Sequence, residues 1–312
     1  MSEAISHVAV IGAGTIGASW AVLFLAHGCE VSVYDTAPGI RDVLDRMLTE
    51  AWPALERLGA ATGAPDRGRL RFATTIADAV AHAHFVQESG PEDPALKGPL
   101  LSTIDRGLPP DRVIASSTSG FTLDMLRGGL SHPERVLIGH PFNPPHLLPL
   151  VEVVADGRTA PAALETALAF YRRMGKSPIH LTRSVLGHVA NRLQAAIWRE
   201  AIHLIDQGVA TLADIDDAVA LGPGLRWAIL GPSATFHLGG GPGGLSSFIE
   251  KLGPAFESYW ADLGTPHLTP DVRAKLEAGV AALPERDHLR VERDRKLVEV
   301  LALLHGKDGP RQ

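Results

Sequence analysis

Two side chains in the middle of the chain could move a proton together, His140 and Glu152. His140 follows an apolar run at 136–139, which predicts that it lies at the carboxyl end of a strand. Glu152 lies within a second apolar run at 150–154. A buried carboxylate beside an imidazole fixes its tautomer and stabilises its protonated form. A general base that removes the proton of an alcohol needs this arrangement. We therefore predict that His140 is a general base and Glu152 its partner.

A glycine-rich turn near the N-terminus has the spacing of a nucleotide-binding loop. Gly12, Gly14 and Gly17 follow an apolar run at 7–11 and open a helical pattern that includes Thr15 and Ile16. The three glycines allow a tight turn, a close approach of the backbone to a pyrophosphate, and close helix–strand packing. The helix N-terminus adds free N–H groups and a positive dipole end. This turn therefore predicts a dinucleotide site.

Asp35 ends the next predicted strand, at 30–34. An acid at this position accepts hydrogen bonds from both ribose hydroxyls of an adenosine and repels a 2′-phosphate. The pattern therefore favours NAD over NADP, although the glycine motif alone leaves FAD open.

The elements that must position these residues alternate between strands and helices in the first part of the chain. Extended runs at 7–11, 30–34, 84–87, 112–116, 136–139, 150–154 and 178–181 flank helical patterns at 40–58, 94–106 and 161–174. This order indicates an α/β domain with a doubly wound, Rossmann-type sheet over residues 1–185. After about residue 185 the periodicity is helical, which predicts an all-helical domain over residues 186–312.

Composition excludes several classes of function. The net charge of −6 offers no reason to expect a nucleic acid or an anionic membrane as partner. The single cysteine, Cys29, cannot form an internal disulfide, and no His/Cys cluster has the spacing of a metal site. The N-terminus lacks the pattern of a secretory signal, and the apolar stretches are too short to span a bilayer. We therefore expect a cytoplasmic protein without a metal.

Four motifs in order along the chain resemble the 3-hydroxyacyl-CoA dehydrogenase superfamily. They are the glycine turn, the Ser-Ser-Thr-Ser segment at 116–119, the His-Pro-Phe-Asn-Pro segment at 140–144 and the Gly-His-Val-Ala-Asn-Arg segment at 187–192. The resemblance implies that His140 is the catalytic base and Glu152 its carboxylate partner. It also implies that Ser119 contacts the substrate oxygen and that Asn191 completes the catalytic tetrad.

The resemblance has two further implications. The segment at 86–92 is similar to the family's stretch beside the nicotinamide half of NAD, which makes Glu92 and Lys97 expected neighbours of the cofactor. The family also implies a homodimer that assembles through the helical domain.

The segment at 222–232 departs from the thioester-using members of the family, because it contains Arg226 followed by Trp227. This pair is similar to the branch that includes L-gulonate 3-dehydrogenase, lambda-crystallin and carnitine dehydrogenase. A guanidinium can hold a free carboxylate through two hydrogen bonds. We expect Arg226 to bind a substrate carboxylate; a helix cap or an interdomain salt bridge is the alternative.

The substrate stays open among small 3-hydroxy acids that resemble gulonate or carnitine. Trp198, Trp227 and Phe236 could form an aromatic box for a quaternary ammonium, although aromatic residues at helical spacing are more often core. Two alternatives remain to oxidation of a free acid. One is a short-chain 3-hydroxyacyl-CoA dehydrogenase, and the other is a non-catalytic, crystallin-like protein that binds NAD.

Overall fold

The computed structural model describes residues 5–305, and its first part is an eight-stranded sheet. The spatial order is β3-β2-β1-β4-β5-β6-β7-β8, and every neighbouring pair is parallel except β6 and β7. The strands are β1 (His7–Ile11), β2 (Glu30–Tyr34), β3 (Leu70–Phe72), β4 (Phe85–Glu88), β5 (Val113–Ser116), β6 (Val136–Pro141), β7 (Leu150–Val154) and β8 (Ser177–Leu181). The predicted doubly wound α/β sheet is confirmed.

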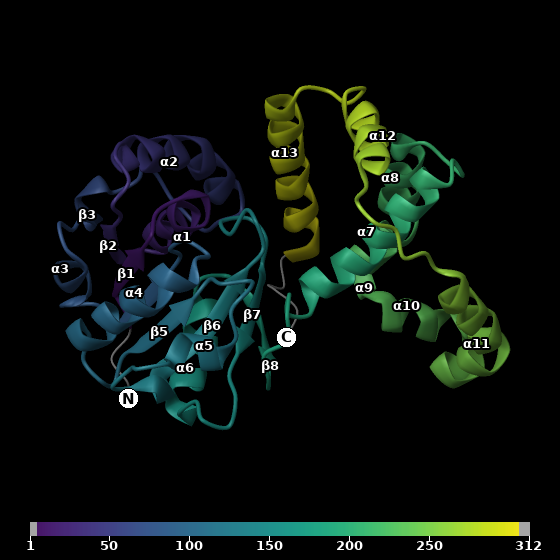
Figure 1. Ribbon diagram of the computed structural model, residues 1–312. Coiled ribbons are helices and arrows are strands. Elements are labelled where there is room, and N and C mark those ends of the chain that lie inside the picture. The colour runs from purple at the N-terminus through teal and green to yellow at the C-terminus, as the bar shows by residue number, and fades with distance from the viewer. Residues whose placement is uncertain (1–4, 306–312) are drawn as a thin grey trace. The chain divides into compact units, whose positions relative to one another are not determined.

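Helices cover both faces of this sheet (Figure 1). One face packs against α1 (Thr15–Ala26), α2 (Ile40–Arg57) and α6 (Pro161–Arg173), and the other packs against α3 (Ile76–Val80), α4 (Pro94–Gly107) and α5 (Leu123–Arg127). Alternate residues of β1 contribute to the two cores: Val8 and Val10 lie in the first, Ala9 and Ile11 in the second. Because successive side chains of a strand point to opposite faces, a continuous apolar run is the pattern of a strand buried on both sides.

The second part of the chain is helical, as predicted. It contains α7 (Ala190–Asp206), α8 (Leu212–Leu221), α9 (Pro223–Leu230), α10 (Pro232–Gly239), α11 (Gly244–Asp262), α12 (Pro270–Val280) and α13 (Arg286–His305). Short 3-10 turns lie at Arg67–Arg69, Pro133–Arg135 and Gly241–Gly243. Among residues 5–305, no helix has the length and apolar character that crossing a membrane requires.

The chain divides into two compact units, and the last helix contributes to both. The sheet unit comprises the chain up to Val189 together with the part of α13 from Glu292 onward, and the helical unit runs from Ala190 to Val291. Val298 and Leu301 of α13 bury their side chains against Leu147, in a small cluster that also includes Leu58. The sequence pattern assigned all of α13 to the helical domain, because periodicity shows that a helix is amphipathic and not which surface it covers.

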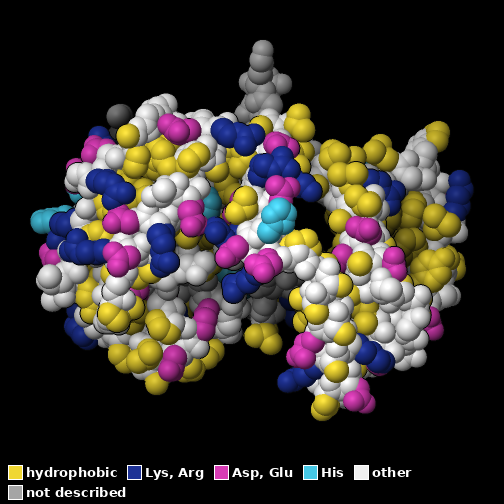
Figure 2. Space-filling view, turned by 90° about the horizontal axis from the view of Figure 1, so that it is seen from above, with side chains coloured by type: hydrophobic (Ala, Val, Ile, Leu, Met, Phe, Trp, Pro, Cys, Tyr) yellow, Lys and Arg dark blue, Asp and Glu magenta, His cyan; other side chains and the backbone are white. Residues whose placement is uncertain are grey.

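The two units differ in how they bury apolar side chains. The sheet unit has two extensive cores, whereas in the helical unit the buried apolar side chains are Ile202, Ile215 and Val272. The space-filling view shows hydrophobic side chains gathered on the surface of the helical unit (Figure 2). Helix α11, for example, exposes a stripe of apolar side chains at helical spacing that includes Leu245, Ile249, Leu252 and Tyr259.

Candidate active site

The antiparallel pairing of β6 and β7 brings His140 and Glu152 together. The two residues are direct partners in the strand register, so their side chains lie on the same face of the sheet. Nδ1 of His140 lies 3.0 Å from Oε2 of Glu152, and the two side chains are 8% and 0% exposed. The carboxylate only accepts hydrogen bonds, so Nδ1 carries the proton and Nε2 is left with a lone pair. The predicted pair therefore exists in the geometry that a general base requires.

A second histidine, which the sequence did not single out, packs beside this pair. The ring of His188 lies 5.0 Å from that of His140, and its Nε2 lies 3.0 Å from the carbonyl oxygen of Thr118. The next residue, Val189, donates its N–H to Oε1 of Glu152 over 2.8 Å. His188 has a φ of 49°, in the left-handed region that non-glycine residues seldom adopt. One short segment therefore contacts three parts of the site.

Burial is the largest influence on His188 and lowers its pKa. Because its pKa is lowered below the ordinary value of 6.5, His188 is neutral near pH 7 and adds no positive charge beside His140. In the neutral ring Nε2–H donates to the Thr118 carbonyl, which leaves Nδ1 unprotonated and without a hydrogen-bond partner within residues 5–305.

Ser119 lies on the loop after β5, and Glu92 holds this loop. Oε1 of Glu92 accepts the backbone N–H of Ser119, and Oε2 accepts the Thr118 hydroxyl, each over 2.8 Å. The Thr118 hydroxyl in turn accepts the N–H of Phe121 over 3.0 Å. Glu92 is thus hydrogen-bonded to Ser119, the predicted substrate-binding residue. That Glu92 also lies near the cofactor stays a prediction.

Lys97 is buried in a different arrangement. Its Nζ lies 2.9 Å from Oε1 of Glu88 and 3.1 Å from the carbonyl oxygen of Gly90, and its side chain is 3% exposed. Oε2 of Glu88 accepts the hydroxyl of Ser116. This buried ion pair links α4 to the end of β4, and the Ser116 hydroxyl joins the end of β5 to the same carboxylate. Lys97 as a cofactor ligand stays a prediction, and the contacts described here are structural.

A buried hydrogen-bond network lies beneath His140. The Tyr171 hydroxyl donates to Oε1 of Gln87 over 2.7 Å, and Nε2 of Gln87 donates to the Ser117 hydroxyl over 2.8 Å and to the Gly139 carbonyl over 3.3 Å. A Cβ at Gly139 would lie 2.0 Å from the Tyr171 hydroxyl oxygen, so only glycine fits before His140. Sequence reasoning missed this network because the four residues are far apart along the chain.

The glycine turn has the shape that a dinucleotide needs. Gly12 has a φ of 87°, and a Cβ at Gly17 would lie 1.8 Å from the carbonyl oxygen of Gly12. At Gly14, by contrast, a Cβ would meet no atom within 4 Å, so the surface over the turn is open. Helix α1 begins there at Thr15 and Ile16, without a side-chain cap and without an acidic residue in its first turn. Its N–H groups are therefore available to a pyrophosphate.

Asp35 connects this turn to β2. Its Oδ2 accepts the N–H of Ala13 over 2.6 Å, and its Oδ1 accepts the N–H of Ala37 over 2.7 Å. Each carboxylate oxygen has two lone pairs, so both retain capacity for a ribose hydroxyl.

The remaining predicted site residues belong to the helical unit. Asn191 is the second residue of α7 and is half-buried, and Arg226 lies exposed on α9. Within residues 5–305 no ion pair of Arg226 is found, and its role in binding a carboxylate stays a prediction beside the interdomain salt bridge. Of the residues of the predicted aromatic box, Phe236 stacks on Phe248 at 4.8 Å and Trp198 is 56% exposed on α7, and the box itself stays a prediction.

The sequence matches two models of one enzyme family. The model described as 3-hydroxyacyl-CoA dehydrogenase, NAD binding domain, matches residues 7–185, and the one described as 3-hydroxyacyl-CoA dehydrogenase, C-terminal domain, matches residues 187–266. The chain belongs to the 3-hydroxyacyl-CoA dehydrogenase family. It is therefore an oxidoreductase that uses NAD, and the predicted resemblance is confirmed.

Several relatives match over nearly the whole chain. L-carnitine dehydrogenase of Streptomyces griseus is 47% identical over 96% of this chain and 90% of its own length. L-carnitine dehydrogenase of a Pseudomonas species is 44% identical over 93% and 92% of the two chains. The crystal structure of 5-formyl-3-hydroxy-2-methylpyridine 4-carboxylic acid 5-dehydrogenase, an NAD⁺-dependent dismutase, is 35% identical, with a TM-score of 0.84 over 97% and 99% of the chains.

Proposed function

We propose that this dehydrogenase oxidises the 3-hydroxyl of a small free 3-hydroxy acid, with L-carnitine as the leading candidate, and that His140 is the general base. The observation that carries the substrate class is the near full-length similarity to several L-carnitine dehydrogenases, at 44–47% identity in the two relatives described above. The departure at Arg226 from the thioester-using members supports the same class.

The proton step follows from the hydrogen bonding of His140. Its Nδ1–H donates to Glu152, so its Nε2 lone pair takes the proton of the substrate hydroxyl. Glu152 then stabilises the imidazolium that forms. The glycine turn at Gly12 and Gly14, together with Asp35, would hold NAD⁺, and the bound cofactor would supply the acceptor for the C3 hydride. Ser119 and Asn191 hold the oxygen as it becomes a carbonyl, and the loop of Ser119 is itself held by Glu92.

Arg226 supplies the preference for a free acid. Its guanidinium is exposed and has no ion-pair partner within the described chain, so it is available for a carboxylate. A two-point hydrogen bond between guanidinium and carboxylate is stronger and more directional than a contact with a neutral thioester.

We further propose that the protein acts as a homodimer assembled through the helical unit, in the cytoplasm. The exposed apolar stripe of α11 supports the dimer, because a stripe at helical spacing needs a covering surface.

The proposed location in the cytoplasm is supported by the single thiol, Cys29, which is buried and forms no disulfide, as is usual in a reducing compartment.

The decisive experiment measures NADH formation with L-carnitine, L-gulonate, 3-hydroxybutyrate and 3-hydroxybutyryl-CoA, with NADP⁺ as the control cofactor. We expect turnover of a free acid with NAD⁺. Arg226→Met should lower kcat/KM for that acid by about 10- to 100-fold, since a charged hydrogen bond contributes about 1.5–3 kcal/mol. Arg199→Met, which removes an exposed arginine of α7, is the matched control. Turnover restricted to the thioester would overturn the free-acid assignment, and no turnover at all would favour a non-catalytic protein.

A further inference from the structure

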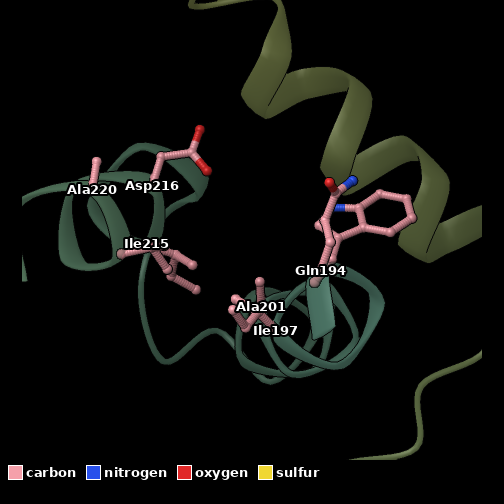
Figure 3. A pocket seen from close by; sticks show the side chains of 8 residues that line it. Gln194, Ile197, Ala201, Ile215, Asp216 and Ala220 are labelled. Atoms are coloured by element: carbon pink, nitrogen blue, oxygen red, sulfur yellow. The ribbon is translucent and has the colours of Figure 1, made fainter. Parts of the chain in front are cut away.

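Charged side chains meet apolar surroundings in two contrasting places. In the helical unit, Asp216 lies at the edge of a mostly apolar hollow of about 610 Å³ between α7 and α8, where it is exposed to solvent (Figure 3). In the sheet unit, Lys176 directly precedes β8 and is only 4% exposed. An exposed carboxylate stays hydrated, whereas an ammonium loses its hydration on burial, so Lys176 needs compensating contacts.

Backbone carbonyls, and no carboxylate of residues 5–305, hold the ammonium of Lys176. Its Nζ donates to the carbonyl oxygen of Leu148 over 2.9 Å and to that of Pro145, and it lies 5.5 Å from the centroid of the Trp20 ring. Burial lowers the pKa of Lys176 to about 7 from its ordinary value of 10.5. An ammonium has three N–H donors and a neutral amine has two, so both carbonyls keep a donor on either side of this pH.

Both carbonyls belong to the connection between β6 and β7, residues 142–149. Three residues of this connection are prolines, which lack an N–H, so it has more backbone acceptors than donors. Within the described chain, neither the Pro145 nor the Leu148 carbonyl has a donor other than Lys176. An apolar side chain at this position would avoid the cost of burying an ammonium but would leave both carbonyls without a donor. The lysine therefore anchors a segment that cannot hold itself through its own backbone.

The side chains of Lys176 and of the catalytic pair lie on opposite faces of the sheet. Lys176 contacts Trp20, in the core that α1 and α6 cover. Val151 and Val153 belong to the same core, so Glu152 between them points to the other face. Lys176 therefore acts on the pair through the backbone of the connection and contacts no reacting atom.

The connection bears directly on His140. Phe142, its first residue, packs edge-on against the imidazole, with ring centroids 5.8 Å apart. A displacement of about 1 Å in a reacting group can cost about 100-fold in rate. We propose that Lys176 is a positioning residue for proton transfer, which anchors the connection at 142–149 and thereby keeps His140 aligned with Glu152. The inference rests on the proposed function, because it takes His140 as the general base.

The test is a double-mutant cycle on NADH formation from a free 3-hydroxy acid. Lys176→Met keeps a long side chain but removes its donors. We expect kcat to fall by about 10- to 100-fold while the KM for NAD⁺ stays within about twofold, because the glycine turn is formed by other residues. In the His140→Gln background the same change should cost less than about threefold, since a positioning residue has no effect once the group that it positions is absent.

Lys275→Met is the matched control. Its ammonium also donates to a backbone carbonyl, that of Asp206 over 2.7 Å, but the side chain is 47% exposed. This change should leave turnover unaltered. Lys176→Gln keeps N–H donors on a shorter side chain, so its kcat should lie between those of the wild type and Lys176→Met. Where Lys176→Met does not fold, Lys176→Gln is compared in the two backgrounds instead.

Proton NMR provides a second measurement that needs no turnover. The Nδ1–H that His140 donates to Glu152 should give a downfield signal that is absent from His140→Gln. We expect this signal to be shifted or lost in Lys176→Met and kept in Lys275→Met.

Equal losses of turnover in the two backgrounds would overturn the inference, as would lower thermal stability with kcat and the downfield signal unchanged. Either result would give Lys176 a structural role alone and leave His140 as the base. Turnover that His140→Gln does not reduce would overturn the general base, and the inference with it. A downfield signal lost from Lys176→Met in a protein that oxidises no free acid would support the positioning role and overturn the proposed substrate.

Discussion

The sheet unit and the helical unit differ in how much of their apolar surface they bury. The sheet unit buries both faces of its strands and satisfies most of its buried polar groups within the same unit, through pairs such as Lys97–Glu88 and Tyr171–Gln87. The helical unit buries few apolar side chains and exposes many, including the stripe of α11. A unit with a well-packed core can hold proton-transfer groups in a fixed geometry. A unit with accessible apolar surface can bind a ligand or another subunit through that surface.

The largest effect should come from breaking the chemistry of the sheet unit at His140. His140→Gln keeps a polar side chain of similar size but removes the base. We expect turnover to fall by about 100- to 10,000-fold, the usual contribution of general base catalysis. NADH binding, measured by fluorescence, should be unchanged, because the glycine turn is formed by other residues. Turnover within tenfold of the wild type would show that another group removes the proton.

A second prediction concerns acid stability, which one buried histidine of the sheet unit should control. Ser19 and His146 are hydrogen-bonded over 2.8 Å, and burial lowers the pKa of His146 to about 4 from its ordinary value of 6.5. The folded protein therefore binds fewer protons than the unfolded chain between pH 6.5 and 4. This contribution to stability is complete above pH 6.5 and is lost as the pH falls toward 4. A difference of about 2.5 pH units corresponds to about 3 kcal/mol.

Urea unfolding of the wild type and of His146→Gln between pH 7 and 4 measures this contribution. The variant should lose less stability on acidification than the wild type. His132→Gln, which changes an exposed histidine, is the control and should follow the wild-type curve. Parallel curves for His146→Gln and the wild type would assign the acid sensitivity to other groups.

A charge on the exposed apolar stripe of α11 should weaken the dimer that we propose to assemble through the helical unit. Ile249→Glu places a carboxylate where the proposed dimer interface requires an apolar side chain. The dissociation constant of the dimer should rise by about 100-fold, because leaving a charge buried and unpaired costs about 3 kcal/mol. Analytical ultracentrifugation over a range of concentrations measures the change. Met125→Glu, at an equally exposed position of the sheet unit, should leave the oligomeric state unaltered. If both substitutions raised the dissociation constant equally, the dimer could not be assigned to the helical unit.

The smallest loss of turnover should come from a change at His188, which packs beside His140 in the sheet unit. His188→Phe keeps a ring beside His140 but removes the hydrogen bond to Thr118. Turnover should fall by about tenfold while the KM for NAD⁺ is unchanged, because a buried carbonyl loses its donor on the loop of Ser119. His180→Phe removes a comparable bond, to the carbonyl of Ala155, away from the site, and should leave turnover unchanged. A loss of thermal stability without a change in turnover would make His188 purely structural.

Local pattern was enough to predict the main elements of the fold. The continuous apolar runs of β1, β4 and β6 and the glycine turn after β1 are properties of neighbouring residues, so their interpretation needed no tertiary contacts. The short elements β3 and α3 were not predicted, because three to five residues carry too little periodicity to distinguish a strand or helix from a loop. The pairing of His140 with Glu152 could be anticipated, since only a short connection separates two strands that must lie side by side.

By itself, the sequence determined the sheet, the nucleotide turn and the types of residue available for proton transfer, because each depends on local periodicity or spacing. Only the tertiary structure decided which distant groups meet. Contacts such as His188 with Thr118, Tyr171 with Gln87, or Glu92 with Ser119 join residues 27 to 84 positions apart in the chain. The same limit applied to α13, whose C-terminal half packs on the sheet unit. An amphipathic pattern shows that a face must be covered, whereas the covering surface is selected by the packing of the whole chain.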